Sequence, residues 1–402
     1  MATATSNIPV QQVRSIYDKK LAVTRLNLTN FRSYSTLRID LDSRPLVLVG
    51  PNGAGKTNLL EAVSCLSHAR GLRRAKLGDM VNYKTSLSED VPRWAVAACV
   101  DGLLGPVSLG VGWTGLSDLP ESREKKDYRI DGSVVSNQAA LAEHVAVVWM
   151  TPAQDRLFIE SPGGRRRFID TLVQAFDPSH RGRVKAFDRA RSDRLRVLRS
   201  SSSDTEWLDS IERGMAECAI AISAARLDII SRIGHEVLDS SGPFPKPVLH
   251  VSGLIEDWLN NIPALEAEGR FRERLASDRL RDTDSGGSVG PHRSDLCAAF
   301  SNDGPEASQA STGEQKAILL AILLAHARLL SRLRGAAPIM LLDEVVAHLD
   351  VSRREALFDN ILSMQVQAWM TGTDMLLFES LAKSAQFMCV DNSTLNEESP
   401  SD

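Results

Sequence analysis

An apolar strand that runs directly into a glycine-rich turn and then into a helix constrains this chain more than any other feature. Leu46–Val49 precedes the turn, and apolar residues recur at helical spacing from Leu59 to Leu66. The turn reads Gly50-Pro51-Asn52-Gly53-Ala54-Gly55-Lys56-Thr57. This is the spacing of a phosphate-binding loop, in which backbone N–H groups and a helix N-terminus face phosphate oxygens. The sequence therefore predicts a nucleoside triphosphate site, with Lys56 reaching the β and γ phosphates and Thr57 binding magnesium.

Composition and charge are those of an ordinary soluble globular protein. The chain has 402 residues, 43% hydrophobic and 24% charged, enough for two or three domains with apolar cores. Its first twenty residues are polar and no apolar run approaches the ~18 residues of a membrane span, so we expect a protein that is neither secreted nor membrane-embedded. The net charge of −4 argues against coating nucleic acid by bulk charge and says nothing about a local basic groove.

The five cysteines are scattered, with no C-x-x-C pair and no histidine at zinc-ligand spacing. They are Cys65, Cys99, Cys218, Cys297 and Cys389. Neither a disulfide framework nor a structural metal is predicted. A reducing, cytoplasmic compartment is the simplest inference.

Strand-like segments fill the first part of the chain, and helical patterns fill the middle. The expected strands, which would form a mixed sheet, are Leu21–Leu28, Leu37–Leu41, Leu46–Val49, Trp94–Val100, Val107–Val111 and Val145–Met150. One helical stripe consists of Ile211, Met215, Cys218, Ile222, Ala225, Ile229 and Ile233. The sequence predicts an α/β fold with a disordered tail at 1–19, a head at 20–153, a helical lobe at 154–284, the rest of the head at 285–391 and a disordered tail at 392–402.

A second run, Pro338–Leu342, is continuously apolar and ends in two acids, Asp343 and Glu344. This is typical of a buried parallel strand that delivers carboxylates to its C-terminal edge, where ligands of open α/β sheets bind. We expect Asp343 to hold magnesium, usually through water, and Glu344 to accept a proton from the attacking water.

A polar turn, Ser311-Thr312-Gly313-Glu314-Gln315-Lys316, opens a strongly apolar helix upstream of that strand. Ser311 and Glu314 have the spacing of a capping box, which on its own indicates only a helix start. Because the turn precedes the acidic strand, its helix N-terminus is also a candidate anion site.

Together these segments resemble the ATP-binding-cassette ATPases. The segments are Gly50–Thr57, the Ser311-x-Gly313-x-Gln315 turn, Asp343-Glu344 and Ala347-His348-Leu349-Asp350. In that superfamily two heads sandwich two ATPs, and the signature residues of each head contact the γ-phosphate held by the other. The resemblance implies an ATP-dependent homodimer in which Ser311, Gly313 and Gln315 act on the partner's ATP. Asp350 would reach across the dimer interface, between the two ATP sites.

Within that superfamily the chain resembles the RecF family from about Leu21 to Val390. The segments that carry this resemblance are Leu28–Tyr34, Thr57–Ala62, Arg70–Arg74, Thr151–Asp155, Arg165–Asp170 and Gly290–Leu296. It implies an ABC/SMC-like phosphate-loop ATPase head with a mainly helical second lobe and no long coiled coil. It also implies recombinational repair, replication and the SOS response, with weak DNA-stimulated ATP hydrolysis acting as a switch. RecR and RecO would be partners, and RecA filaments would be loaded on gaps coated by single-strand-binding protein.

At several positions the role of the residue is left open by the resemblance. Many relatives carry an aspartate where this chain has Glu344, so the carboxylate role is kept while the hydrolysis rate is open. Transporter cassettes place a histidine after the next strand, where this chain has Trp369-Met370-Thr371-Gly372-Thr373-Asp374, so the γ-phosphate sensor is unassigned. By resemblance, Gln154 binds magnesium and water. Arg32 touches the nucleotide phosphates by resemblance, or is a surface arginine near a strand end.

Basic residues gather in three places and can neutralise DNA phosphates. They are Arg70, Arg73, Arg74 and Lys76; Arg165, Arg166 and Arg167; and Arg181, Arg183, Lys185, Arg189, Arg191, Arg194, Arg196 and Arg199, for which a solvated helix face is the alternative. No helix-turn-helix, zinc finger or aromatic stacking motif accompanies them, so backbone and shape contacts are expected. We predict a positive groove over double-stranded DNA, near its junction with a single-stranded gap, assembled by ATP-driven dimerisation.

Three other classes share such a head. A transporter's nucleotide-binding subunit is disfavoured by the missing histidine and by the more than 250 residues between Thr57 and Ser311. A long-armed chromosome-organising ATPase does not fit into 402 residues. An ABC-type nuclease head would be joined to a metal-dependent cutting domain, and no separate acidic cluster follows Asp374.

Overall fold

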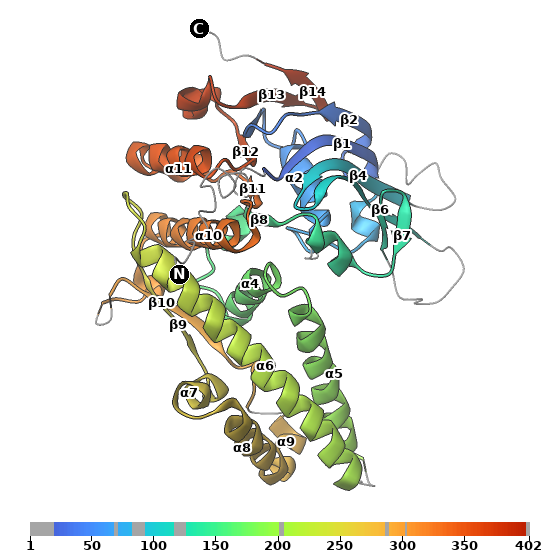
Figure 1. The fold of residues 1–402 in the computed structure, drawn as a ribbon, viewed down its shortest axis with the longest axis vertical. Coiled ribbons are helices and arrows are strands. Elements are labelled where there is room, and N and C mark those ends of the chain that lie inside the picture. The colour runs from blue at the N-terminus through green and yellow to red at the C-terminus, as the bar shows by residue number, and fades with distance from the viewer. Residues whose placement is uncertain are drawn as a thin grey trace, which may run out of the picture. The chain divides into compact units, whose positions relative to one another are not determined.

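The computed structural model describes residues 20–67, 71–82, 93–115, 126–200, 205–285, 289–301 and 304–398. The chain forms two compact units, one of residues 1–152 with 327–402 and the other of residues 153–326 (Figure 1). Helix α10 (Thr312–Arg334) contributes to both, because its residues up to His326 belong to the second unit. Within the described ranges, no helix is both long and apolar enough to cross a membrane.

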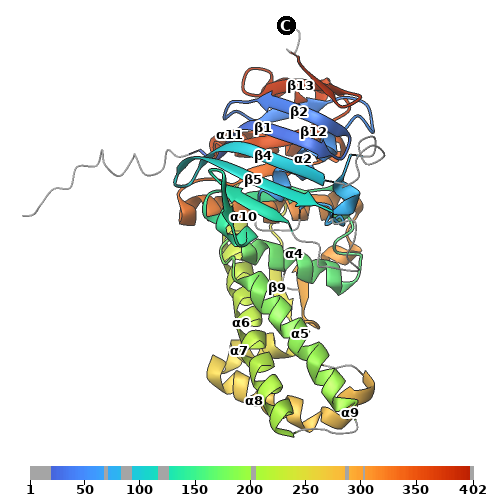
Figure 2. The same ribbon diagram turned by 90° about the vertical axis from the view of Figure 1, so that its right-hand side faces the viewer.

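An antiparallel sheet forms one layer of the first unit (Figure 2). Its strand order is β2-β1-β4-β5-β6-β7, with bounds Tyr34–Asp40, Ala22–Phe31, Arg93–Gly102, Gly105–Thr114, Asp127–Ile130 and Ser133–Val135. Along β4, buried Trp94, Val96, Ala98 and Val100 alternate with more exposed residues. This alternation follows from the two-residue period of a strand and gives the sheet one apolar face.

A second, largely parallel sheet carries the two segments that sequence analysis singled out. Its order is β14-β13-β3-β12-β11-β8, with bounds Thr394–Glu397, Gln386–Asp391, Leu46–Val49, Ala368–Gly372, Ile339–Leu342 and Val147–Met150. All residues of β3, β11 and β12 are buried, as expected for continuous apolar runs in a parallel sheet. The phosphate-loop strand and the acidic strand therefore point the same way, with β12 between them.

Helix α2 (Lys56–Cys65) packs against strands of both sheets. Leu59, Leu60 and Val63 of this helix join side chains of both sheets in one apolar core. Gln367, which precedes β12, ties the sheets together: its Oε1 accepts from the Val23 N–H at 2.8 Å and its Nε2 donates to the Val23 carbonyl at 3.0 Å. Helix α11 (Val351–Ser363) follows the acidic strand.

Two details of this unit differ from the sequence prediction. The predicted strands were expected in one mixed sheet, but they divide between two, because β1, β2, β4 and β5 pair only with one another and with β6. Within the tail expected to be disordered, Thr394–Glu397 instead form β14, paired with β13, and residues 399–402 lie outside the described residues. Asn392 and Ser393 have φ of 45° and 65°, so these polar residues make the tight turn of a β-hairpin.

The second unit is mainly helical, as predicted. Its helices are α4 (Pro162–Gln174), α5 (His180–Leu198), α6 (Thr205–Leu238), α7 (Leu254–Asn261), α8 (Ala264–Ser277) and α9 (Arg279–Ser285). The predicted stripe lies on α6, where Met215, Ile222, Ile229 and Ile233 are at most 4% exposed. Side chains from α5, α6 and α8 meet in a core around Phe187 and Phe271.

A two-stranded antiparallel ladder lies within this helical unit. Strand β9 (Val248–Ser252) pairs with β10 (Asp295–Ala299). The predicted return to the head at residue 285 therefore differs from the structure, because this ladder holds residues 295–299 beside β9 and the unit continues to His326.

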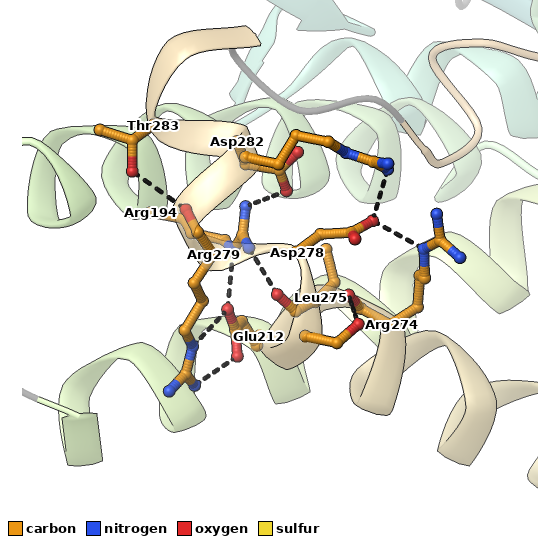
Figure 3. A network of polar contacts seen from close by, with 10 residues as sticks. Arg194, Glu212, Arg274, Leu275, Asp278, Arg279, Asp282 and Thr283 are labelled. Atoms are coloured by element: carbon orange, nitrogen blue, oxygen red, sulfur yellow. Dashed lines mark hydrogen bonds and ion pairs between the residues drawn. The ribbon is translucent and has the colours of Figure 1, made fainter.

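A buried ionic cluster joins four helices of the second unit (Figure 3). Arg194 of α5 is 4% exposed and donates to Glu212 at 2.7 Å, to Asp282 at 2.8 Å and to the Leu275 carbonyl at 2.7 Å. Arg279 donates to both carboxylate oxygens of Glu212, at 3.1 and 2.6 Å. One guanidinium thus binds groups from α6, α8 and α9, which we call the Arg194 cluster.

Candidate functional site

The phosphate loop follows β3, and the close approach of its backbone to neighbouring groups explains two of its glycines. A Cβ at Gly50 would lie 2.1 Å from the Val390 carbonyl oxygen of the adjacent strand. Gly55 is the N-cap of α2 with φ of 115°, a conformation that favours glycine, and a Cβ there would lie 2.8 Å from the Tyr34 hydroxyl. The loop thus presents the open N-terminus of α2, which suits phosphate oxygens.

Lys56 lies folded over this loop. Its Nζ donates to the Gly50 carbonyl at 2.5 Å and the Pro51 carbonyl at 2.9 Å. Burial lowers the pKa of Lys56, and the negative charges of Glu344 and Asp343 oppose that shift. The ammonium therefore lies in a poorly solvated place beside both acids, where it would attract phosphate oxygens strongly.

Thr57 and Asp343 meet at the edge of the parallel sheet. The Thr57 hydroxyl donates to Asp343 Oδ1 at 2.9 Å, although 286 residues separate them. Thr371 of β12 donates to the same oxygen, also at 2.9 Å. Hydroxyl and carboxylate oxygens are the ligands that Mg²⁺ prefers, so this pair fits the magnesium predicted for it.

Glu344 has an unusual backbone conformation. Its φ is 53°, in the left-handed region that non-glycine residues rarely adopt, and its N–H donates to the Thr371 hydroxyl at 2.8 Å. Glu344 is partly exposed, and its negative charge acts to raise the pKa of Lys56, against the effect of burial. A carboxylate in this place can accept a proton from a water molecule near the phosphates.

The turn between β1 and β2 supports the phosphate loop. The Tyr34 hydroxyl donates to the Gly55 carbonyl at 3.2 Å, and Asn58 donates to the Ser33 hydroxyl at 2.9 Å. Two nitrogens of Arg32 donate to Glu61, each at 2.8 Å, and a third donates to the Asp79 carbonyl at 2.6 Å. Fully buried Glu61 thus fixes the Arg32 guanidinium, and the predicted contact of Arg32 with nucleotide phosphates stays a prediction.

Asp350 is exposed and caps α11, where its carboxylate accepts the Arg353 N–H at 2.9 Å. This contact explains why an aspartate begins that helix. Its predicted role at a dimer interface stays a prediction.

The signature turn and Gln154 lie in the second unit. Ser311 and Glu314 form the predicted capping box, with the Ser311 N–H donating to Glu314 at 2.9 Å and the Glu314 N–H to Ser311 at 3.4 Å. Gly313 is exposed with no atom within 4 Å of an added Cβ, so the start of α10 is open to a ligand. Gln315 is instead fully buried and donates to the Ala310 carbonyl at 2.8 Å, which anchors the turn.

Gln154 ends a short 3₁₀ helix and is partly buried. The next residue, Asp155, pairs with Lys316 of α10 at 3.4 Å. The segment that carries Gln154 is thus tied to the signature helix within this unit.

The predicted basic patches divide into surface and internal residues. Arg73, Arg74 and Lys76 are exposed, although Arg73 donates to Asn58 at 2.8 Å, and Arg167 is exposed on α4. Arg70 lies outside the described residues.

Three other predicted basic residues face the interior of the second unit. Arg165 is 11% exposed and donates twice to Asp295, each time at 2.7 Å, and to three carbonyls. Arg166 donates to the Ser294 carbonyl at 2.8 Å, and Arg194 belongs to its own cluster. Their donors serve the fold, and their predicted contact with DNA stays a prediction.

Comparison with known proteins identifies the family. The family described as RecF/RecN/SMC N terminal domain matches residues 22–394. The DNA replication and repair protein RecF of Rhizobium meliloti (strain 1021) is 43% identical over 376 residues, which cover 93% of this chain and 98% of that protein. The chain belongs to the RecF family. The RecF of Agrobacterium fabrum (strain C58 / ATCC 33970) is similar, with 42% identity over 374 residues, 92% of this chain and 97% of its own length.

Solved structures agree on the fold. A structure of the recombination mediator protein RecF-ATP in the RecFOR pathway matches with a TM-score of 0.80 at 18% identity, covering 95% of this chain and 98% of that one. An Smc head domain from Pyrococcus furiosus matches with a TM-score of 0.52 at 15% identity, covering 95% and 96%. The predicted ABC/SMC-like head of a RecF family member is therefore confirmed.

Two polar residues that organise the site were not predicted from the sequence. Thr371 was noted only for standing near an expected histidine, yet it contacts both acids. Glu61 was noted only within a family motif, yet it fixes Arg32. The signal for Thr371 was its place near the end of an apolar strand, beside the strand that carries the acids.

Proposed function

We propose that this chain is an ATP-dependent DNA-binding protein of recombinational repair and replication. It binds ATP and Mg²⁺ at the phosphate loop, dimerises around two ATPs and clamps double-stranded DNA near single-strand gaps. Slow, DNA-stimulated hydrolysis then releases the DNA. The observation that carries the nucleotide site is the 2.9 Å hydrogen bond between Thr57 and Asp343, which brings the loop and the acidic strand to one sheet edge.

Support for ATP as the ligand comes from the site and from the family. The loop offers an open helix N-terminus and a poorly solvated lysine, both suited to a triphosphate. The similar solved RecF structures were determined with ATP or ATPγS, according to their descriptions. The many relatives named RecF favour this function over that of a transporter subunit or a nuclease head with the same kind of site.

Hydrolysis in this proposal relies on four residues of the first unit. Lys56 offsets charge on the β and γ phosphates, and Glu344 accepts the proton of the attacking water. Mg²⁺ held by Thr57 and Asp343 would stabilise the charge on the phosphate oxygens. In this proposal the reaction is slow, so that hydrolysis times the release of DNA.

The signature turn of the second unit would act on ATP held by a second copy. Its exposed serine and glycine stand at an open helix N-terminus, which suits a γ-phosphate. Binding across two copies would make dimerisation depend on ATP, because the nucleotide forms part of the interface.

DNA contacts in this proposal are electrostatic. Exposed Arg73, Arg74, Lys76 and Arg167 supply charge for phosphates, without any base-reading motif. RecR and RecO are proposed as partners, and loading of RecA as the outcome, in keeping with the RecFOR pathway named for the similar structures.

The test is binding to a gapped DNA duplex, measured by fluorescence anisotropy with and without ATP and Mg²⁺. The native chain is compared with Lys56→Met, which removes the ammonium from the loop and keeps a flexible side chain. We expect ATP-dependent binding in the native chain, loss of that dependence in the variant, and weaker binding as salt rises.

Two results would contradict the proposal. DNA binding that ignores ionic strength would argue against phosphate contacts. An absence of DNA binding under every nucleotide condition would favour an ATPase coupled to another partner, such as a transporter-type subunit.

A further inference from the structure

Strand β12 lies between the phosphate-loop strand and the acidic strand. In register, Thr371 pairs with Leu48 of β3, and its neighbour Met370 pairs with Leu342 of β11. Residue 371 therefore lies in the strand between the one that leads into the loop and the one that leads into the two acids. Thr371 is 1% exposed, so its hydroxyl must find partners within the protein.

The Thr371 hydroxyl contacts both acidic residues with different parts of the group. It donates its one proton to Asp343 Oδ1 at 2.9 Å and accepts the Glu344 backbone N–H at 2.8 Å. A hydroxyl has one donor and two acceptor positions, so the two contacts are compatible and each fixes the direction of the other. Asp343 must accept in this arrangement, as a magnesium-binding carboxylate does.

The contact with Glu344 bears on its strained backbone. A glutamate with φ of 53° is in a sparsely populated conformation that costs free energy and needs support from its surroundings. The bond from its N–H to Thr371 is such a support. It fixes the backbone from which the Glu344 carboxylate projects, and the negative charge of that carboxylate stabilises the ammonium of Lys56.

We propose that Thr371 is a positioning residue that sets Asp343 and Glu344 together for hydrolysis. It does not touch the nucleotide in this proposal; it acts through the carboxylate of one acid and the backbone of the other. The inference rests on the ATP hydrolysis proposed above and assigns a role to the segment where transporter cassettes have a histidine.

The simpler explanation is that Thr371 merely fills a strand position. A β-branched residue suits the middle of a sheet, and valine has nearly the same shape as threonine. The two explanations differ over the hydroxyl. Thr371→Val keeps the packing but leaves the Glu344 N–H without its acceptor and takes one of two hydrogen-bond donors from Asp343 Oδ1, whereas Thr371→Ser keeps the hydroxyl and removes a methyl group.

The experiment compares native chain, Thr371→Val and Thr371→Ser by three measurements. Amide hydrogen exchange at Glu344, without nucleotide, reports the backbone contact. Equilibrium ATP binding reports the loop, and single-turnover hydrolysis reports the chemistry. If the valine variant does not fold, Thr371→Ala replaces it with the same expectations.

We expect the valine variant to exchange the Glu344 amide at least about tenfold faster, since a buried hydrogen bond is lost. Its hydrolysis should fall by about tenfold or more, with ATP affinity within about threefold of native. The serine variant should stay within about threefold of native in all three measurements.

Native-like exchange and hydrolysis in the valine variant, or an equal loss in the serine variant, would overturn the inference. Failure of the native chain to bind ATP would instead contradict the proposed function. The exchange measurement tells these apart, because it needs no nucleotide.

Discussion

The nucleotide site of the first unit and the Arg194 cluster of the second use charged residues in different ways. In the first unit, Lys56, Asp343 and Glu344 follow β3 and β11, two strands that are wholly apolar. In the second unit, Arg194 and Glu212 lie inside, at most 4% exposed, and bind helices to one another. These charges serve chemistry in the nucleotide site and cohesion in the Arg194 cluster.

This difference determines what a substitution should do. An apolar core holds the head together, so a change of charge at the sheet edge leaves that core intact. In the helical unit, removal of one ion leaves its partners buried without compensation, which is costly. The head should thus lose function while it keeps its stability, and the helical unit should lose stability first.

The largest expected effect comes from Arg194→Ala. It removes the guanidinium that binds Asp282 and that shares Glu212 with Arg279, and breaking such a buried cluster costs about 3–5 kcal/mol. Urea unfolding followed by circular dichroism should show a large drop in stability, while ATP affinity of the folded fraction should be unchanged.

Arg196→Ala is the matched control on the same helix. Arg196 is 72% exposed and pairs with Asp193 at the surface, so its loss should cost at most about 1 kcal/mol. Equal effects of the two substitutions would break the comparison, because burial would then not decide the cost of losing an ion pair.

In the head, Asp343→Asn should have the opposite effect from Arg194→Ala: it should reduce function and leave stability almost unchanged. The amide oxygen can still accept from Thr57 and Thr371, so stability should change by less than about 1 kcal/mol. Hydrolysis should fall by about 100-fold or more, because the magnesium ligand loses its charge. Titration of the ATPase rate with Mg²⁺ measures the second effect, and thermal unfolding without nucleotide measures the first. A large fall in melting temperature would show that this edge also holds the fold together.

The sequence patterns that indicated the head's site are local ones. Glycines at the loop and acids at the end of an apolar strand act through their immediate neighbours in the chain, so short motifs contain the necessary information. The signal for Arg32 was weaker, because its partner Glu61 lies on a helix and only the fold brings them together. The hairpin at Asn392 was missed because polar composition was taken to indicate disorder.

Charges inside the helical unit were harder to foresee. Periodicity found the apolar stripe of α6, but Arg194 was grouped with surface arginines that flank it. Phe187 and Arg194 are seven residues apart on α5 and both are buried, so the helical period places them on one face. That spacing was the available signal. The partners Glu212 and Asp282 come from other helices, and no local pattern predicts such pairs.

A further expected effect concerns pH and a second buried ionic group of the helical unit. Burial would raise the pKa of Asp170, but hydrogen bonds from His180 and the charge of Arg226 outweigh it and hold that pKa below its usual value. A carboxyl whose pKa is lower in the folded state stabilises the protein above its unfolded pKa, and this stability is lost as pH falls below about 4. Asp170→Asn should therefore lower stability at neutral pH and flatten its decline in acid, as measured by urea unfolding between pH 3 and 7. Asp40→Asn, at an exposed pair of the head, is the control and should change neither appreciably. An unchanged acid decline in the Asp170 variant would mean that the interior charges of this unit do not govern its response to acid.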